Sequence, residues 1–265
     1  MKHVVHAWGD PAAPLVVCLH GVQAHGRRFR RIAEQRLATR FRVLAPDLRG
    51  HGRSGWEPPW NLETHVRDVL DAIAGERDDP LTWIGHSFGG RLALELLFRA
   101  PERAAAAVLL DPALQLAPER ALELAEEERL ERVYASVEEA LAWKREATTR
   151  APAAALDEEI LEHLIESPDG RYRFRYSQSA VVAMYGELAV PPPTAATPHD
   201  RAAEPRARVL VVAGQESDFV HDEHMRGLRA WFRDELRLVT VPGGHLVLWD
   251  AFDETADAID AFLAP

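Results

Sequence analysis

The sequence has almost no cysteine and little lysine. Cys18 is the only cysteine in 265 residues, which excludes an intrachain disulfide and fits a reducing compartment. It lies in the apolar run PLVVCLHG, so we expect a buried, unreactive thiol. Only two of the 31 basic residues are lysines, and the net charge is −11. A nucleic-acid partner is therefore not expected, because phosphate binding needs clustered basic residues.

Long apolar runs, targeting signals and cofactor motifs are also missing. No stretch approaches the roughly 20 apolar residues of a transmembrane helix, and the first ten residues, MKHVVHAWGD, contain no signal-peptide core. No G-x-G-x-x-G follows the first predicted strand, and there is no P-loop. We therefore expect a cytoplasmic protein that uses no metal or organic cofactor and has no membrane partner.

Short apolar runs alternate with longer helical patterns along most of the chain. Several runs are apolar nearly throughout, which is typical of strands covered on both faces of a parallel sheet. The predicted strands are 14–20, 41–47, 81–86, 106–111, 207–214 and 235–242, and helical patterns between them include 27–40, 61–75 and 90–100. This alternation predicts an α/β fold with a doubly wound, mostly parallel sheet flanked by helices.

The alternation stops between about residues 112 and 205. This segment is rich in Ala, Leu, Glu and Arg at helical spacing, and it ends in the proline-rich stretch VPPPTAATPHDRAAEP. The strands before and after it fit one sheet. We therefore predict a helical cap at 112–205, inserted into a core that comprises residues 1–111 and 206–265.

Ser87 stands in the stretch WIGHSFGG, between a predicted strand and a predicted helix. Gly85-His86-Ser87-Phe88-Gly89 match G-x-S-x-G, in which the small flanking residues permit a sharp turn that exposes the serine hydroxyl. A plain turn serine is the alternative. The strand before the motif and the helix after it favour a nucleophile.

A serine hydroxyl needs a base that accepts its proton. Of the twelve histidines, His245 in TVPGGHLVLWD follows the last predicted strand and precedes the final helix, so we predict it as that base. His86 is expected to point away from the serine at the tight turn. His221 and His224 have the i,i+3 spacing of a metal pair but no evident third ligand, and we interpret them as solvated loop histidines.

Five motifs together resemble the α/β-hydrolase fold superfamily, in particular its capped, cofactor-free serine hydrolases of the esterase and lipase type. They are LHGVQAHGRRF, APDLRGHGRS, IGHSFGG, VLVVAGQESD and PGGHLVLWD, in the family's order. The resemblance implies a cap after the strand that corresponds to the family's sixth. It also implies an oxyanion hole formed by the backbone N–H groups of Val22 and Phe88. His20, Arg49 and His51 are expected to hold neighbouring loops.

A catalytic triad also needs an acid that orients the histidine, and the sequence leaves two aspartates as candidates for it. In the family it usually stands three residues after a glycine, but the third residue after Gly214 is Ser217, and Asp218 comes one later. Asp218 is our first choice, and Glu216 stands one position too early. Asp111 ends a core strand where some relatives place their acid. It is the alternative acid, or else a helix cap.

These residues predict a serine hydrolase that cleaves carboxylic esters of small to medium apolar acyl or aryl groups through an acyl-enzyme. Lactone hydrolysis, carbon–carbon bond hydrolysis and cofactor-free perhydrolysis are alternatives on the same fold, and so is a non-catalytic ligand-binding module. The expected partner is a small-molecule ester. The cap residues expected to contact it, with plain packing as the alternative, are Tyr172, Tyr176, Met184 and Tyr185.

Overall fold

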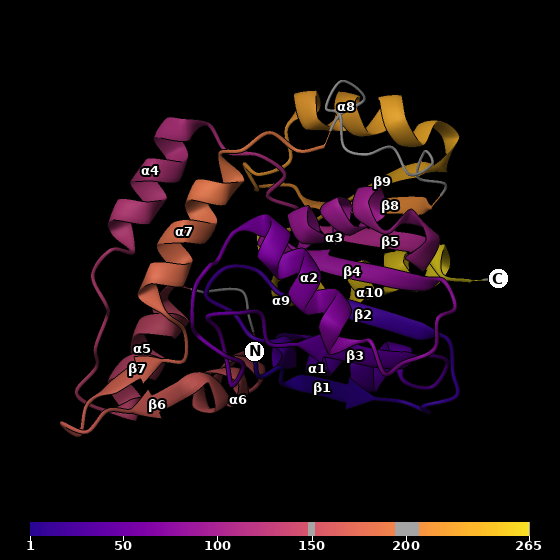
Figure 1. Ribbon diagram of the computed structural model, residues 1–265. Coiled ribbons are helices and arrows are strands. Elements are labelled where there is room, and N and C mark those ends of the chain that lie inside the picture. Colours follow the sequence, from indigo (N-terminus) through magenta and orange to yellow (C-terminus); the bar gives the residue numbers. More distant parts are fainter. Residues whose placement is uncertain (148–151, 194–206, 265) are drawn as a thin grey trace.

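A seven-stranded, mostly parallel sheet forms the centre of the protein (Figure 1). The computed structural model describes residues 1–147, 152–193 and 207–264. The strand order is β1-β3-β2-β4-β5-β8-β9, and only β1 runs antiparallel to its neighbour. The strands are β1 (Val5–Trp8), β2 (Leu15–Leu19), β3 (Arg42–Pro46), β4 (Leu81–His86), β5 (Ala104–Leu110), β8 (Arg208–Gly214) and β9 (Leu236–Val241). The six predicted strands are confirmed, and the edge strand β1 was not predicted.

The sheet is covered on both faces, as its apolar strands predict. Along β2, Val16 and Cys18 belong to one buried cluster, whereas Val17 and Leu19 belong to another, because successive side chains of a strand point to opposite faces. Burial raises the pKa of the Cys18 thiol. The thiol is therefore protonated and enclosed, which agrees with the unreactive cysteine expected.

Helices on the two faces complete these clusters. The first cluster includes side chains of α2 (Leu62–Ala72), α3 (Phe88–Arg99) and α8 (Asp222–Phe232). The second includes side chains of α9 (Val247–Asp250) and α10 (Phe252–Phe262). The second also includes residues of the predicted helix 27–40, which consists of η1 (Gly26–Phe29), α1 (Arg30–Ile32) and the π-helix η2 (Ala33–Leu37); two further 3-10 turns are η3 (Pro101–Arg103) and η4 (Arg233–Glu235).

The elements between β5 and β8 group together beyond one end of the sheet, at the left of Figure 1. We call them the cap: α4 (Pro118–Glu127), α5 (Val137–Ala147), α6 (Ala153–His163), β6 (Leu164–Glu166), β7 (Tyr172–Phe174) and α7 (Gln178–Leu188). The predicted insertion was entirely helical, but β6 and β7 form an antiparallel pair. Most of the proline-rich stretch 190–205 lies outside the described residues. No helix in the described ranges is both long and apolar enough to cross a bilayer.

Buried neutral histidines make the stability of this fold sensitive to acid. Burial lowers the pKa of His51 to about 4 and that of His65 to about 3. The unfolded chain takes up these protons near pH 6.5, so stability is full above that pH and falls as the pH drops toward the folded values. Each histidine contributes up to about 1.4 kcal/mol per pH unit in that window.

We expect the urea midpoint of unfolding to fall between pH 7 and pH 4.5. His65→Phe keeps a ring edge-on to Phe88, whose centroid lies 5.4 Å away, and it should fall less steeply. Equal pH slopes for the two proteins would contradict the neutral buried state of His65.

Candidate active site

The loops that follow five parallel strands meet at one edge of the sheet. Ser87 follows β4, Asp111 follows β5 and His245 follows β9. The segment containing Val22 follows β2, and Ser217 lies in the loop after β8. Because the carboxyl ends of parallel strands lie at the same edge, this topology gathers residues that are far apart in the sequence.

Ser87 has a strained backbone, with φ 56° and ψ −119°. The flanking glycines explain how the turn closes. A Cβ on Gly85 would lie 2.1 Å from the carbonyl oxygen of Gly89, and a Cβ on Gly89 would lie 2.0 Å from that of Leu19. Both positions therefore require glycine, which is the structural reason for the spacing of the motif.

Hydrogen bonds hold this turn against the next strand. The N–H of Ser87 donates to the carbonyl of Leu110 (3.1 Å), and the carbonyl of Ser87 accepts from the N–H groups of Gly90 (2.9 Å) and Ala113 (3.2 Å). The strained serine is thus fixed between the start of α3 and the end of β5. Such fixed strain is typical of a nucleophile elbow.

Three contacts hold His245 in place, two to its ring and one to its backbone carbonyl. Its Nδ1 lies 2.6 Å from Oδ2 of Asp111, and its ring stacks on Phe219 at a centroid distance of 4.0 Å. Burial and the nearby His245 lower the pKa of His86 well below its usual value. The neutral His86 donates from Nε2 to the carbonyl oxygen of His245 (2.9 Å), so it helps to fix the loop that contains His245.

The carboxylate at His245 is Asp111, which corrects the geometry expected for Asp218. Asp111 is fully buried; its Oδ2 accepts from the hydroxyl of Ser217 (2.5 Å), and its Oδ1 accepts from the N–H of Gly214 (2.9 Å). Asp218 instead lines a cavity of about 500 Å³ beside Arg120. Ser217, three residues after Gly214 in the loop that follows β8, therefore binds the same carboxylate.

The two predicted oxyanion donors lie in segments beside Ser87. Phe88 is the first residue of α3, where an N–H group has no acceptor within the helix. The loop before Val22 runs directly past the serine, since a Cβ on Gly21 would lie 2.9 Å from the Cβ of Ser87. Both backbone segments are therefore adjacent to the serine, as an oxyanion hole requires.

The histidine and arginine of the neighbouring motifs hold loops, as expected. The N–H of Leu48 donates to Nε2 of His20 (2.9 Å), and Nδ1 of His20 donates to the carbonyl of Gly21 (2.8 Å). Burial keeps the pKa of His20 well below its usual value, which fits this neutral form. Arg49 binds both carboxylate oxygens of Asp68 at 2.6 and 2.9 Å.

The four predicted substrate contacts lie in different surroundings. Met184 is completely buried in the core cluster, and Tyr176 is buried in a separate cap cluster. Tyr172 is part of β7, where its backbone pairs with that of Tyr134. Tyr185 contacts both clusters, as does Val22. Of the four, Tyr185 therefore lies at the boundary between cap and core that also contains a predicted oxyanion residue.

Sequence reasoning did not identify several residues of this site. Ser217 and Phe219 contact Asp111 and His245, and Trp249 packs into the cap cluster from α9. Ser217 carried a signal, because it occupies the position at which an aspartate was expected. His221 precedes α8, but His224 lies within it and is half-buried, so only the first fits a solvated loop histidine.

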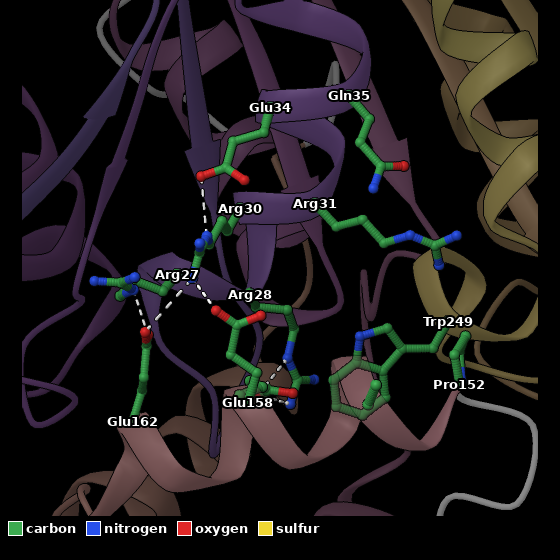
Figure 2. A pocket seen from close by; sticks show the side chains of 12 residues that line it. Arg27, Arg28, Arg30, Arg31, Glu34, Gln35, Pro152, Glu158, Glu162 and Trp249 are labelled. Atoms are coloured by element: carbon green, nitrogen blue, oxygen red, sulfur yellow. Dashed lines mark hydrogen bonds and ion pairs between the residues drawn. The ribbon is translucent and has the colours of Figure 1, made fainter.

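Ion pairs join the cap to the core beside this region (Figure 2). Side chains of α6 face arginines of η1 and α1: Glu162 pairs with Arg27 and Glu158 pairs with Arg30. Glu159 accepts from Nε (3.0 Å) and Nη2 (2.7 Å) of Arg28. These residues line a cavity of about 390 Å³. Its charged lining makes it a cap–core interface and a poor site for an apolar acyl group.

Comparison with known proteins agrees with this fold. Residues 14–252 match the family described as alpha/beta hydrolase fold, and the chain belongs to that family. Lipase LipV of Mycobacterium tuberculosis is 33% identical over 267 residues, which cover 98% of this chain and 97% of that protein.

Solved structures show the same fold. The crystal structure of E-2-(acetamidomethylene)succinate hydrolase matches with a TM-score of 0.82 and 22% identity, over 98% of this chain and 94% of that one. An alpha/beta hydrolase from Novosphingobium aromaticivorans matches with a TM-score of 0.75 and 25% identity, over 98% of this chain and 92% of that one. These matches support the same overall fold for this chain.

Proposed function

We propose that this α/β hydrolase is a serine-dependent carboxylic ester hydrolase. The observation that supports it most is the contact of 2.6 Å between Nδ1 of His245 and the buried Asp111, at the same sheet edge as the strained Ser87. A histidine oriented in this way presents Nε2 as the proton acceptor. The relationship to a protein named as a lipase, along nearly the whole chain, points to esters as substrates.

The reaction has two acyl transfers. His245 takes the proton of the Ser87 hydroxyl while Oγ attacks the ester carbonyl, and the tetrahedral oxygen accepts from the N–H groups of Val22 and Phe88. Each such donor stabilises the intermediate by about 3 kcal/mol. His245 then gives its proton to the leaving alcohol, which leaves an acyl-enzyme. Water repeats the sequence with the same base, and the acid is released.

Asp111 is the acid in this proposal. It orients the imidazole and stabilises its charged form, and it receives hydrogen bonds from Gly214 and Ser217 in addition to the one from His245. We do not assign this role to Asp218, the acid first expected, because its side chain lines the neighbouring cavity. That cavity also contains Phe219, the ring stacked on His245, so it reaches the proposed triad.

The substrate class follows from the cap. Its cluster is largely apolar and aromatic; Tyr185 of α7 packs against it from within the cap, and Val22 and Leu246 pack against it from the loops of the proposed active site. Apolar surroundings favour esters of small to medium acyl or aryl acids over charged ones. We therefore propose Tyr185 as the cap residue in contact with the acyl group.

A fluorophosphonate probe followed by intact-mass measurement tests the proposal. We expect one adduct on the wild-type protein and none on Ser87→Ala, since the probe reacts with an activated serine. Folded wild-type protein without an adduct would contradict the ester hydrolase and favour a ligand-binding module.

Ser217 is expected to act as a positioning residue through Asp111. Ser217→Ala removes a donor to a buried carboxylate, a hydrogen bond worth about 1.5–3 kcal/mol, so we expect kcat to fall about tenfold. The more basic carboxylate should also move the acid limb of the kcat/KM profile to higher pH. Ser217→Thr retains the hydroxyl and should restore both values. An unchanged pH profile in Ser217→Ala would show that the bond only packs the loop.

A further inference from the structure

Three metal-ligating side chains meet between the cap and the core, apart from the residues of the proposed triad. They are His25, Glu159 and His163, and one ligand atom of each lies within 4.8 Å of the others. Glu159 and His163 are four residues apart on α6, so they share a helix face. His25 precedes η1 in the loop that follows β2. The cluster therefore joins α6 to the loop that also contains Val22.

Three polar atoms of this cluster have no hydrogen-bond partner. Nε2 of His25, Nε2 of His163 and Oε2 of Glu159 are buried, and within the described residues none has a hydrogen-bond partner. Both histidines are only 4% exposed. Nε2 of His25 lies 3.5 Å from the other carboxylate oxygen of Glu159. Buried polar atoms nearly always have partners, so three such atoms together could bind a further ligand.

Nearby cations leave one carboxylate oxygen available. Both hydrogen bonds from Arg28 go to Oε1 of Glu159, so Oε2 stays open while the carboxylate is held in place. Outer partners of this kind commonly orient metal ligands.

We propose that His25, Glu159 and His163 bind one divalent transition-metal ion of the zinc class, which clamps α6 of the cap onto the loop after β2. Two imidazole nitrogens and one carboxylate oxygen are a common zinc donor set, with water in the fourth position. Ligands about 2.0–2.1 Å from a tetrahedral ion lie about 3.4 Å apart. The ligand atoms, which now lie within 4.8 Å of one another, therefore have to approach by up to about 1.4 Å. The rings of His25 and His163, which are stacked with centroids 4.5 Å apart, also have to rotate so that both nitrogens point at the ion.

Two other groups provide comparison sites. His3, Asp68 and Asp71 also lie close together, but Arg49 occupies both carboxylate oxygens of Asp68. His221 and His224 have ring centroids 5.4 Å apart and belong to no group of three such ligands within the described residues. This pair, at the start of α8, is thus a control for zinc bound by histidines outside the cluster.

Zinc titration of chelator-treated, full-length protein tests the proposal by calorimetry and thermal unfolding. We expect one Zn²⁺ per chain, with a Kd of about 1 μM or lower and a rise in Tm. His163→Phe keeps a ring beside Phe174 and Tyr176, at 5.7 and 5.8 Å, but removes the nitrogen. It should weaken zinc binding at least about 100-fold. His25→Gln should have the same effect and serves as the test if His163→Phe does not fold.

The double variant His221→Ala/His224→Ala should bind zinc like the wild type. Three results would overturn the proposal. The first is that the wild type, His163→Phe and His25→Gln bind zinc with equal affinity. The second is that only the His221→Ala/His224→Ala variant loses zinc binding, and the third is that folded wild-type protein binds no zinc at about 1 mM.

Discussion

Asp111→Asn is expected to lower kcat for ester hydrolysis about 10⁴-fold, because asparagine cannot hold the imidazole in the required tautomer or stabilise its charge. The bond of 2.6 Å to Nδ1 of His245 is the contact that this substitution changes. KM should change little, since the carboxylate is buried behind the histidine. Steady-state kinetics with a p-nitrophenyl ester measures both values.

Asp218→Asn is the matched control, because it makes the same chemical change in the neighbouring loop. Its side chain lines the cavity beside Arg120, so we expect a change in kcat of less than about threefold. A loss confined to Asp218→Asn would return the acid to the position first inferred from the motif. Thermal unfolding of both variants separates loss of activity from loss of fold.

Ser87→Ala and His245→Ala should each lower kcat about 10⁶-fold, and the double variant should lose no more than either single variant. Groups that act as one unit show this non-additivity, since the base is useless without the nucleophile. A residual rate above that in water should remain, because the N–H groups of Val22 and Phe88 are backbone groups that both substitutions leave in place. Additive losses in the double variant would mean that the two side chains act separately.

The sequence predicted the features that depend on local chain geometry. The glycines around Ser87 are required because any side chain there would make contacts of 2.0–2.1 Å, so the spacing of the glycines alone predicts the sharp turn. Likewise, the strands around it are apolar throughout because both faces of the sheet are covered. Local patterns of this kind survive in a single sequence.

The acid was not predictable in the same way. Asp111 and His245 are 134 positions apart, and their contact depends on how the loops after β5 and β9 converge. The third residue after Gly214 does lie at the acid's position, but it is Ser217, whose hydroxyl donates to the carboxylate oxygen of Asp111 that also contacts His245. Nothing local distinguishes a serine that replaces an acid from one that binds it.

The cap shows a second limit. Tyr172 and Phe174 lie among residues with helical spacing, but they form a three-residue strand after a turn at Pro168-Asp169-Gly170. Such short strands contain too few residues to establish a period of two. Met184 illustrates a related difficulty, since periodicity identifies a buried helix face without telling which neighbour covers it.

The position of Asp111 has a consequence for exchanging the cap between relatives. The chain leaves the sheet directly after Asp111 and returns in β8, the strand paired with β5. Gly214, at the opposite end of β8 from the returning segment, donates its N–H to Asp111, so only the first junction of the cap lies at this carboxylate. A chimaera that joins the foreign segment beyond Ala113 and before Arg208 should keep every hydrogen bond to Asp111 and Ser87 described above, and it is therefore expected to change substrate preference without changing the chemical step.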